Sequence, residues 1–235
     1  MELPPLTDAV VVKRYKRFLV DVVLADGHEI TAHCPNTGRM TGCWKPGAPA
    51  QLSYSDNPGR KLAWTLERVD MGAGWIGVNT HRVNAVVAES LEKGCVPGLE
   101  GYGRLRREVQ LELQGHRSRL DMVLDQGPLP DAYIEVKNVT LLEHSRLSFP
   151  DAVTARGQKH LHALLQLVKD GNRGIMIYAM NRPEGNCFRV AGTIDPEYAA
   201  ALKHAIAGGV EVIPLRLRHT ATGINAASAV GLCED

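Results

Sequence analysis

The feature that most constrains this chain is an apolar stretch that carries two charges, Tyr133-Ile134-Glu135-Val136-Lys137. On a strand, alternate side chains point to the same face, so Glu135 and Lys137 project together. Burying charged groups costs free energy unless they are compensated, so a strand this apolar needs a reason to keep them. The alternative is an ordinary amphipathic strand with a solvated Glu–Lys face.

A second carboxylate, Asp121, lies within the preceding apolar stretch, residues 118–124. Asp is disfavoured in the middle of a strand, and the short connection containing Gly and Pro makes the two strands antiparallel neighbours. Side by side, Asp121 and Glu135 repel unless one is protonated or a cation lies between them. Because hard divalent ions prefer oxygen ligands, we expect Mg²⁺ or Mn²⁺ as the cofactor. Lys137 would position the attacking water or stabilise developing negative charge.

The order of the expected elements agrees with this chemistry. Residue patterns predict helices at 83–93, 154–168 and 195–207, and strands at 106–113, 118–124, 132–139, 174–180 and 210–214. Asp…Glu-x-Lys on elements in this order is typical of restriction-endonuclease-like nucleases, the PD-(D/E)xK class. Residues 81–235 are therefore predicted to form an α/β nuclease domain with Asp121, Glu135 and Lys137 as catalytic residues.

Two further acids are candidate metal ligands beside Asp121 and Glu135. Glu108 lies on the preceding strand, and Glu89 lies on the first helix. A surface ion pair with Arg106 or Arg107 is the alternative for Glu108. At the start of the second helix, Asp151 or Thr154 can serve as the N-cap. Backbone N–H groups there favour anions, which predicts a phosphate site. Its candidate residues are Arg156, Gln158, Lys159 and His160.

Residues 1–80 have a different texture, with short β-like runs at 18–24, 29–33, 50–55, 63–69 and 75–78. Asp26-Gly27 after the first run is a hairpin signal. About five short strands in this length suggest a small antiparallel barrel, of which the oligonucleotide-binding (OB) fold is one type. The predicted fold is therefore α+β overall: an N-terminal OB-like β-barrel followed by the restriction-endonuclease-like α/β domain.

The formal net charge is only +1, so only local clusters of basic residues can indicate nucleic-acid binding. Tyr15, within a basic run, is a candidate for stacking on a base. A polar, Gly-rich loop at residues 34–43 offers further candidate phosphate contacts. The alternative for the basic runs is a solvated surface. Outside the second helix, the candidate nucleic-acid-binding residues are Lys13, Arg14, Tyr15, Lys16, Arg17, Asn36, Thr37, Arg39, Arg106, Arg107 and Arg119.

Five cysteines are present, an odd number with no C-x-x-C pair. A disulfide framework is therefore not expected, and a reducing cytosol is the simpler environment. The first residues contain no apolar signal region, and no apolar run has the roughly 18–20 residues that a membrane helix needs. We expect a cytoplasmic protein with no membrane partner.

Many short motifs together give a specific resemblance over nearly the whole chain. They are KRYKRF (13–18), HCPNTG (33–38), NP (57–58), GVNT (77–80), LRREV (105–109), SRLD (118–121), EVKNVT (135–140), FPDAVT (149–154) and RGQKHL (156–161). In these motifs the chain resembles the bacterial and archaeal sugar fermentation stimulation protein A family. The resemblance implies an OB-like domain, a restriction-endonuclease-like domain, non-specific DNA binding and a regulatory role in sugar (maltose) metabolism.

Three functions remain in competition at this stage. The first is a metal-dependent nuclease that binds and cuts DNA. The second is a non-catalytic DNA-binding regulator whose affinity comes from phosphate contacts and falls steeply with salt. The third is hydrolysis of RNA or a small nucleotide by the same metal chemistry. Nucleases of this type often dimerise, which leaves a homodimer open.

Overall fold

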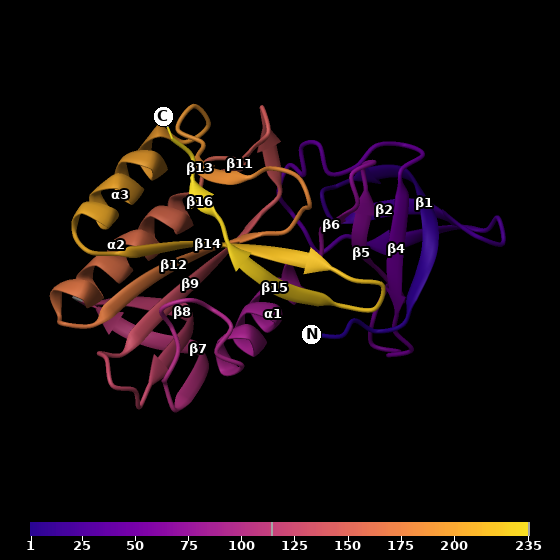
Figure 1. Cartoon of the computed structure of the whole chain (residues 1–235). Helices are drawn as coiled ribbons and strands as arrows, with labels where there is room; N and C mark the ends of the chain where they lie inside the picture. The colour runs from indigo at the N-terminus through magenta and orange to yellow at the C-terminus, as the bar shows by residue number, and fades with distance from the viewer. Residues whose placement is uncertain (114, 235) are drawn as a thin grey trace.

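Six strands build the N-terminal part of the computed structural model, which describes residues 1–113 and 115–234. The sheet order is β3-β2-β1-β4-β5-β6, and a further pairing of β3 with β5 closes five strands into a barrel. This barrel lies at one end of the molecule (Figure 1) and confirms the expected OB-like fold. The strands are β1 (Leu6–Tyr15), β2 (Leu19–Leu24), β3 (Glu29–His33), β4 (Pro49–Tyr54), β5 (Trp64–Asp70) and β6 (Trp75–Gly77).

The barrel is filled by the side chains that alternate inward along each strand. Val20 and Val22 of β2, Ala32 of β3 and Leu52 of β4 are all buried. Their neighbours in sequence point outward, so the outer surface of β2 and β3 carries a different set of residues. β1 is not among the expected strands, because its last residues, Lys13 to Tyr15, read as a basic run.

The second part is a six-stranded sheet covered by helices on both faces (Figure 1). The sheet order is β15-β14-β12-β9-β8-β7, and β9, β12 and β14 run parallel. Buried residues of α1 pack on one face, and those of α2 and α3 pack on the other. The expected α/β domain is thus confirmed. Its elements are α1 (Thr80–Glu92), β7 (Arg104–Leu113), β8 (His116–Asp125), β9 (Ala132–Val139), α2 (Ala155–Lys169), β12 (Arg173–Met180), α3 (Pro196–Ala207), β14 (Glu211–His219) and β15 (Ile224–Ala229).

A small four-stranded sheet adjoins this domain and corrects one expectation. It consists of β10 (Leu141–Glu143), β11 (Arg146–Phe149), β13 (Cys187–Val190) and β16 (Gly231–Leu232). A disulfide joins Cys187 of β13 to Cys233, just after β16. The expectation that disulfides are absent was therefore wrong for this pair, which lies 46 residues apart in sequence. Cys34, Cys43 and Cys95 are free thiols.

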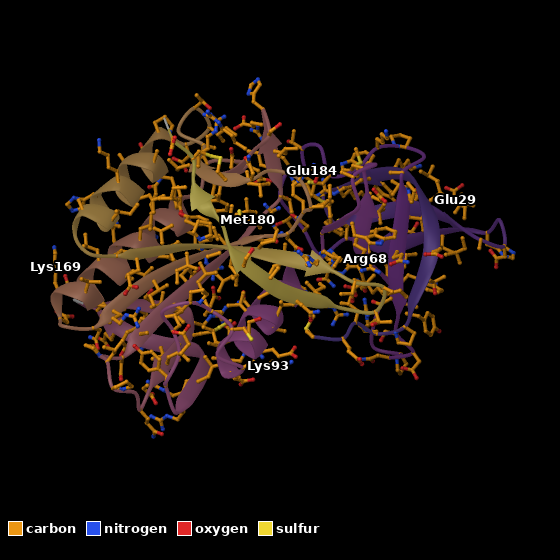
Figure 2. All side chains as sticks on the ribbon, viewed as in Figure 1. Glu29, Arg68, Lys93, Lys169, Met180 and Glu184 are labelled. Carbon is orange, nitrogen blue, oxygen red and sulfur yellow. A yellow bond between two sulfur atoms is a disulfide. The ribbon has the colours of Figure 1, made fainter. Side chains whose placement is uncertain are left out.

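Two arginines fix the barrel against the α/β domain. The Arg68 guanidinium of β5 donates to the carbonyl oxygens of Thr220 and Ala221, at 2.6 and 2.9 Å, in the β14–β15 turn. Figure 2 shows Arg68 at this boundary. Arg82 of α1 reaches back to the buried Glu67 of β5, with Nη2 2.7 Å from Oε1. These polar and charged contacts are partly buried, and they join the barrel to the α/β domain. No described helix is long and apolar enough to span a membrane.

Candidate active site

Asp121 lies where β8 and β9 stop pairing. The last pair in the ladder is Met122 with Ile134, so Asp121 and Glu135 come next on the two strands. The Asp121 carboxylate takes the place of a ladder bond, because the Val136 amide donates to its Oδ2 at 2.8 Å. Asn84 of α1 donates to its Oδ1 at 2.9 Å. The strand period and the short connection therefore place the two acids side by side on neighbouring strands, as predicted.

Glu135 is almost fully buried, with 3% of the residue exposed. Its Oε1 accepts from the Lys137 ammonium at 2.6 Å and also contacts His160 Nδ1. Lys137 Nζ lies 3.3 Å from the same His160 nitrogen. The other oxygen, Oε2, is buried and accepts no hydrogen bond from any described residue. Oε1 of Glu135 thus has two polar partners, whereas Oε2 is left available to bind a ligand.

The two carboxylates have opposite pKa shifts. Burial, followed by the negative charge of Glu135, raises the pKa of Asp121 above its ordinary value, against the opposing bonds from Val136 and Asn84. Burial also acts to raise the pKa of Glu135, but the His160 hydrogen bond and the Lys137 charge outweigh it and lower that pKa. Asp121 therefore favours a bound proton, or another cation, more than an isolated Asp does.

Glu108 and Glu89, the other candidate metal ligands, are not gathered with this pair. Glu108 of β7 lies opposite Asp121, but its side chain is 54% exposed and its Oε2 pairs with Arg119 Nε at 3.1 Å. Glu89 pairs with the N-terminal amine at 2.8 Å and with Lys93. It follows Asn84 by five residues, which turns it roughly 140° around the helix. Within the described residues, no three His, Cys, Asp or Glu side chains form a metal-binding group.

The start of α2 contributes one residue to the site directly. His160 is buried against Glu135, and Arg156 Nε lies 3.4 Å from His160 Nε2. Gln158 turns away, because its amide lies 3.4 Å from Asp195 and 3.5 Å from Glu197. Lys159 is exposed and lines a hollow of about 440 Å³ between α2 and the β7–β8 hairpin. Of the predicted phosphate contacts on α2, Arg156 and Lys159 therefore stay accessible.

The basic run in the barrel divides into structural and exposed residues. The Arg14 guanidinium donates to the carbonyl oxygens of Arg17, Asn36 and Gly38 at 2.6, 2.7 and 2.9 Å. Lys13 pairs with Asp21 at 3.3 Å, and the Tyr15 hydroxyl bonds to the same carboxylate. The ring of Tyr15 is thus held beside β2. Lys16 and Arg17 are exposed in the β1–β2 turn.

Near β7, Arg106 Nε pairs with the buried Asp125 at 2.8 Å, and Arg119 pairs with Glu108. Arg107 is exposed. These pairs hold the β7–β8 hairpin together, so only part of the predicted basic patch is open to a ligand.

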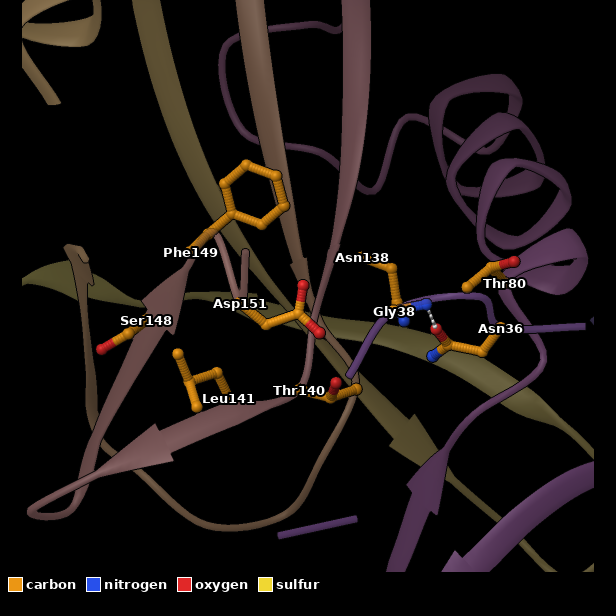
Figure 3. Close-up of a pocket in the computed structure, with 9 residues that line it drawn as sticks. All are labelled: Asn36, Gly38, Thr80, Asn138, Thr140, Leu141, Ser148, Phe149 and Asp151. Atoms are coloured by element: carbon orange, nitrogen blue, oxygen red, sulfur yellow. Dashed lines mark hydrogen bonds between the residues drawn. The ribbon is translucent and has the colours of Figure 1, made fainter. Parts of the chain in front are cut away.

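The predicted Gly-rich loop faces the α/β domain across a pocket of about 70 Å³ (Figure 3). The buried side chain of Asn36 accepts from the Gly38 amide at 2.9 Å, and Asp151 accepts from the Arg39 amide at 3.0 Å. A Cβ on Gly38 would lie 2.8 Å from Asp151 Oδ2, so only glycine allows this close approach. Thr37 and the Arg39 side chain are exposed. Asn36 therefore shapes the loop rather than extending from it.

Asn84 is the site residue that sequence reasoning did not select. It shares its helix with Glu89, and an acid is the more familiar metal ligand. The helical period carried the relevant information, since Asn84 lies three and four positions before the buried Val87 and Ala88 and so shares their side of the helix, whereas Glu89 is turned about 140° away from Asn84.

Family models match both halves of the chain. The model described as "SfsA N-terminal OB domain" matches residues 12–78, and the one described as "Sugar fermentation stimulation protein RE domain" matches residues 81–223. Curated sugar fermentation stimulation protein homologs are similar over nearly their whole length. That of Acidithiobacillus ferrooxidans is 47% identical over 219 residues, 93% of each chain. That of Magnetococcus marinus is 50% identical over 214 residues, 91% of this chain and 90% of the relative.

A solved structure has the same fold. It is that of Pyrococcus furiosus SfsA in complex with Ca²⁺, which superposes with a TM-score of 0.86 at 26% identity. The match covers 100% of this chain and 98% of the other. The likeness therefore extends over both parts of the molecule and their relative placement.

Proposed function

This chain belongs to the sugar fermentation stimulation protein family, and on that premise we propose that it is a divalent-metal-dependent nuclease that binds and cuts DNA. The observation that carries the proposal is the pair formed by the half-buried Asp121 and the buried Glu135. One oxygen of Glu135 has no hydrogen-bond partner in the described structure, and burial and the Glu135 charge raise the pKa of Asp121. Buried carboxylate oxygens are normally hydrogen-bonded, so an oxygen without a partner beside a second acid favours a role as a ligand to a cation.

The residues present fit a hard divalent cation. Mg²⁺ and Mn²⁺ take oxygen ligands, and Mg²⁺ keeps several waters, so two carboxylates are a sufficient protein contribution. Asp121 and the open oxygen of Glu135 would hold the ion, and the Ca²⁺ in the Pyrococcus furiosus relative supports a cation-binding role for this family. When bound, such an ion supplies Lewis acidity toward a phosphoryl oxygen and lowers the pKa of a water.

The remaining residues of the site act by position and charge. The Lys137 ammonium, 2.6 Å from Glu135, holds a positive charge beside the place where negative charge would develop on a phosphoryl group. His160 holds Glu135 from the side of α2, so that the carboxylate keeps one orientation. Asn84 and the Val136 amide fix Asp121 in the same way. The chain thus preorganises both acids before any substrate arrives.

A basic surface beside the site supports nucleic acid as the substrate. The hollow between α2 and the β7–β8 hairpin is lined by Arg117, Lys159 and His162, and none of the described residues that line it carries a carboxylate. Lys159 precedes His160, so this surface is adjacent to the catalytic pair. Phosphate contacts of this kind give affinity without sequence preference and weaken as salt rises.

The test is cleavage of labelled single- and double-stranded DNA and RNA by the full chain with Mg²⁺, Mn²⁺ or EDTA. We expect metal-dependent cutting of DNA, lowered about 100-fold or more in Glu135→Gln. Glu112→Gln, an exposed carboxylate on β7, is the matched control and should cut like the parent. DNA binding without cutting would contradict the nuclease proposal and leave the non-catalytic regulator. Cutting confined to RNA would replace the proposed substrate.

A further inference from the structure

The segment that contains β16, residues 230–233, is held to the small sheet by few noncovalent contacts, and we call it the strap. β16 pairs with β13 at two positions only, and it lies beside β13 in Figure 1. The Val230 amide donates to the Pro214 carbonyl oxygen and the Cys233 amide to that of Phe188, each at 2.8 Å. Val230 is partly buried against the core, but both residues of β16 are exposed. So short and exposed a strand buries little apolar surface to offset the entropy of ordering it.

The disulfide between Cys187 of β13 and Cys233 of the strap supplies the remaining hold. The two cysteines lie 46 residues apart in sequence. Joining residues that far apart greatly reduces the conformations available to the chain when the strap is open. The strap is therefore fixed on β13 while the two sulfurs are bonded, and it can leave β13 when they are not.

The disulfide is placed where a thiol can reach it without unfolding of the core. Cys187 and Cys233 are each partly exposed, whereas the free thiols Cys34 and Cys43 are buried. Exposed disulfides are the ones that exchange readily, because a thiolate must approach one of the sulfurs. The chain also keeps an exposed free thiol, Cys95, so it is not built as a framework of permanent disulfides.

The strap covers the outer edge of β13, and the contacts on the inner side of β13 do not depend on it. β13 pairs with β11 at three positions. Phe188 of β13 is 1% exposed and stacks on Tyr178, with ring centroids 4.1 Å apart. Phe149 of β11 contacts the same Tyr178 and also Tyr198. Opening the strap therefore leaves one edge of β13 unpaired and keeps this aromatic cluster in place.

We propose that Cys187 and Cys233 form a thiol–disulfide exchange site that opens and closes the strap. A thiolate of a dithiol reductant attacks one sulfur, the S–S bond of the protein breaks, and a mixed disulfide forms. The second thiol of the reductant then displaces the protein sulfur, so the protein gains two thiols and the reductant becomes a disulfide. Two electrons and two protons pass to the protein, and exchange with a small disulfide such as oxidised glutathione reverses the step. This inference does not depend on the proposed nuclease activity.

The first part of the experiment is alkylation of the full chain without denaturant, once in oxidised glutathione and once in dithiothreitol, followed by mass spectrometry. In oxidised glutathione, iodoacetamide should label Cys95 alone. In dithiothreitol it should also label Cys187 and Cys233, while Cys34 and Cys43 stay protected by burial. Labelling of Cys187 and Cys233 in both buffers, or in neither, would overturn the inference.

The second part is amide hydrogen exchange in the same two buffers. In dithiothreitol the Val230 and Cys233 amides should exchange at least about tenfold faster than in oxidised glutathione, while the amides of β9 and β12 do not change. Cys233→Ser should exchange fast at Val230 in both buffers. Cys95→Ser removes the exposed free thiol and is the matched control, so it should behave like the parent. Equal exchange of the parent strap in both buffers would overturn the inference, and so would faster exchange throughout β9 and β12, which would make the disulfide a support of the whole fold.

Discussion

Two buried glutamates of this chain are satisfied in opposite ways. Glu67, where the barrel meets α1, accepts from Ser53 and Arg82 at Oε1, each at 2.7 Å. At Oε2 it accepts from Asn79 at 2.9 Å and Arg82 at 3.1 Å. Glu135 is equally buried, but its bonds from Lys137 and His160 all fall on one oxygen, and the other oxygen has no described partner. A second acid, Asp121, is also placed beside Glu135.

The difference separates a carboxylate that holds the fold from one that, under the proposed function, binds a metal ion. Burial alone would raise the pKa of Glu67, but Arg82 and Ser53 lower it below its ordinary value, so the charged form is stabilised by folding. At the second site the pKa of Asp121 is raised, so folding stabilises its neutral form. Keeping Asp121 ionised beside Glu135 therefore costs free energy, and natural proteins keep such a cost where function requires it.

The largest expected effect is the loss of folding stability when Glu67 is replaced. Glu67→Gln removes the charge that compensates Arg82, whose side chain is 29% exposed in that pair. Breaking a buried pair from one side costs about 3–5 kcal/mol, and we expect the lower end because Gln keeps some hydrogen bonds. Urea denaturation at neutral pH measures it. A loss below about 1 kcal/mol would remove the contrast between the two sites.

The next prediction concerns the pH dependence of that loss. The pKa of Glu67 is lowered in the folded chain from 4.5, so its contribution is present above pH 4.5 and disappears as pH falls through the lower folded value. Protonated Glu67 resembles Gln, so the stability difference between parent and Glu67→Gln should shrink below pH 4.5. Denaturation curves between pH 7 and pH 3 test this. A constant difference would assign the loss to shape rather than charge.

The smallest expected effect is at Asp121. Asp121→Asn removes the repulsion from Glu135, while its remaining carbonyl can still accept from Val136. We expect the free energy of unfolding to stay the same or rise by about 1 kcal/mol at neutral pH, while the proposed cutting activity should be lost. The measurement is the same urea series. A loss as large as that of Glu67→Gln would make Asp121 a structural residue.

Much of the site could be predicted from the sequence, because it depends on local rules. The period of a strand places Glu135 and Lys137 on one face, and a short connection brings Asp121 beside them. The contacts of Asp195 as the N-cap of α3, bonding to the Tyr198 amide at 2.9 Å, follow from the same kind of rule.

The remaining features depend on contacts between distant parts of the chain. The bond between Arg68 and Thr220 spans 152 residues, and the disulfide joins strands that pair only in the folded sheet. Basic residues show the same limit, since Arg14 and Lys16 look equivalent in sequence. Arg14 donates hydrogen bonds to backbone carbonyl oxygens, whereas Lys16 is exposed. Only tertiary packing decides which of them can meet a ligand.

Titration of Mn²⁺ by isothermal calorimetry tests the central claim most directly, because it detects the ion at the Asp121–Glu135 pair without requiring a substrate. The account predicts binding to the parent, its loss in Glu135→Gln, and its survival in Glu89→Gln, whose carboxylate is paired with the N-terminal amine instead. A parent that binds no Mn²⁺, or a Glu135→Gln variant that binds it like the parent, would contradict the account.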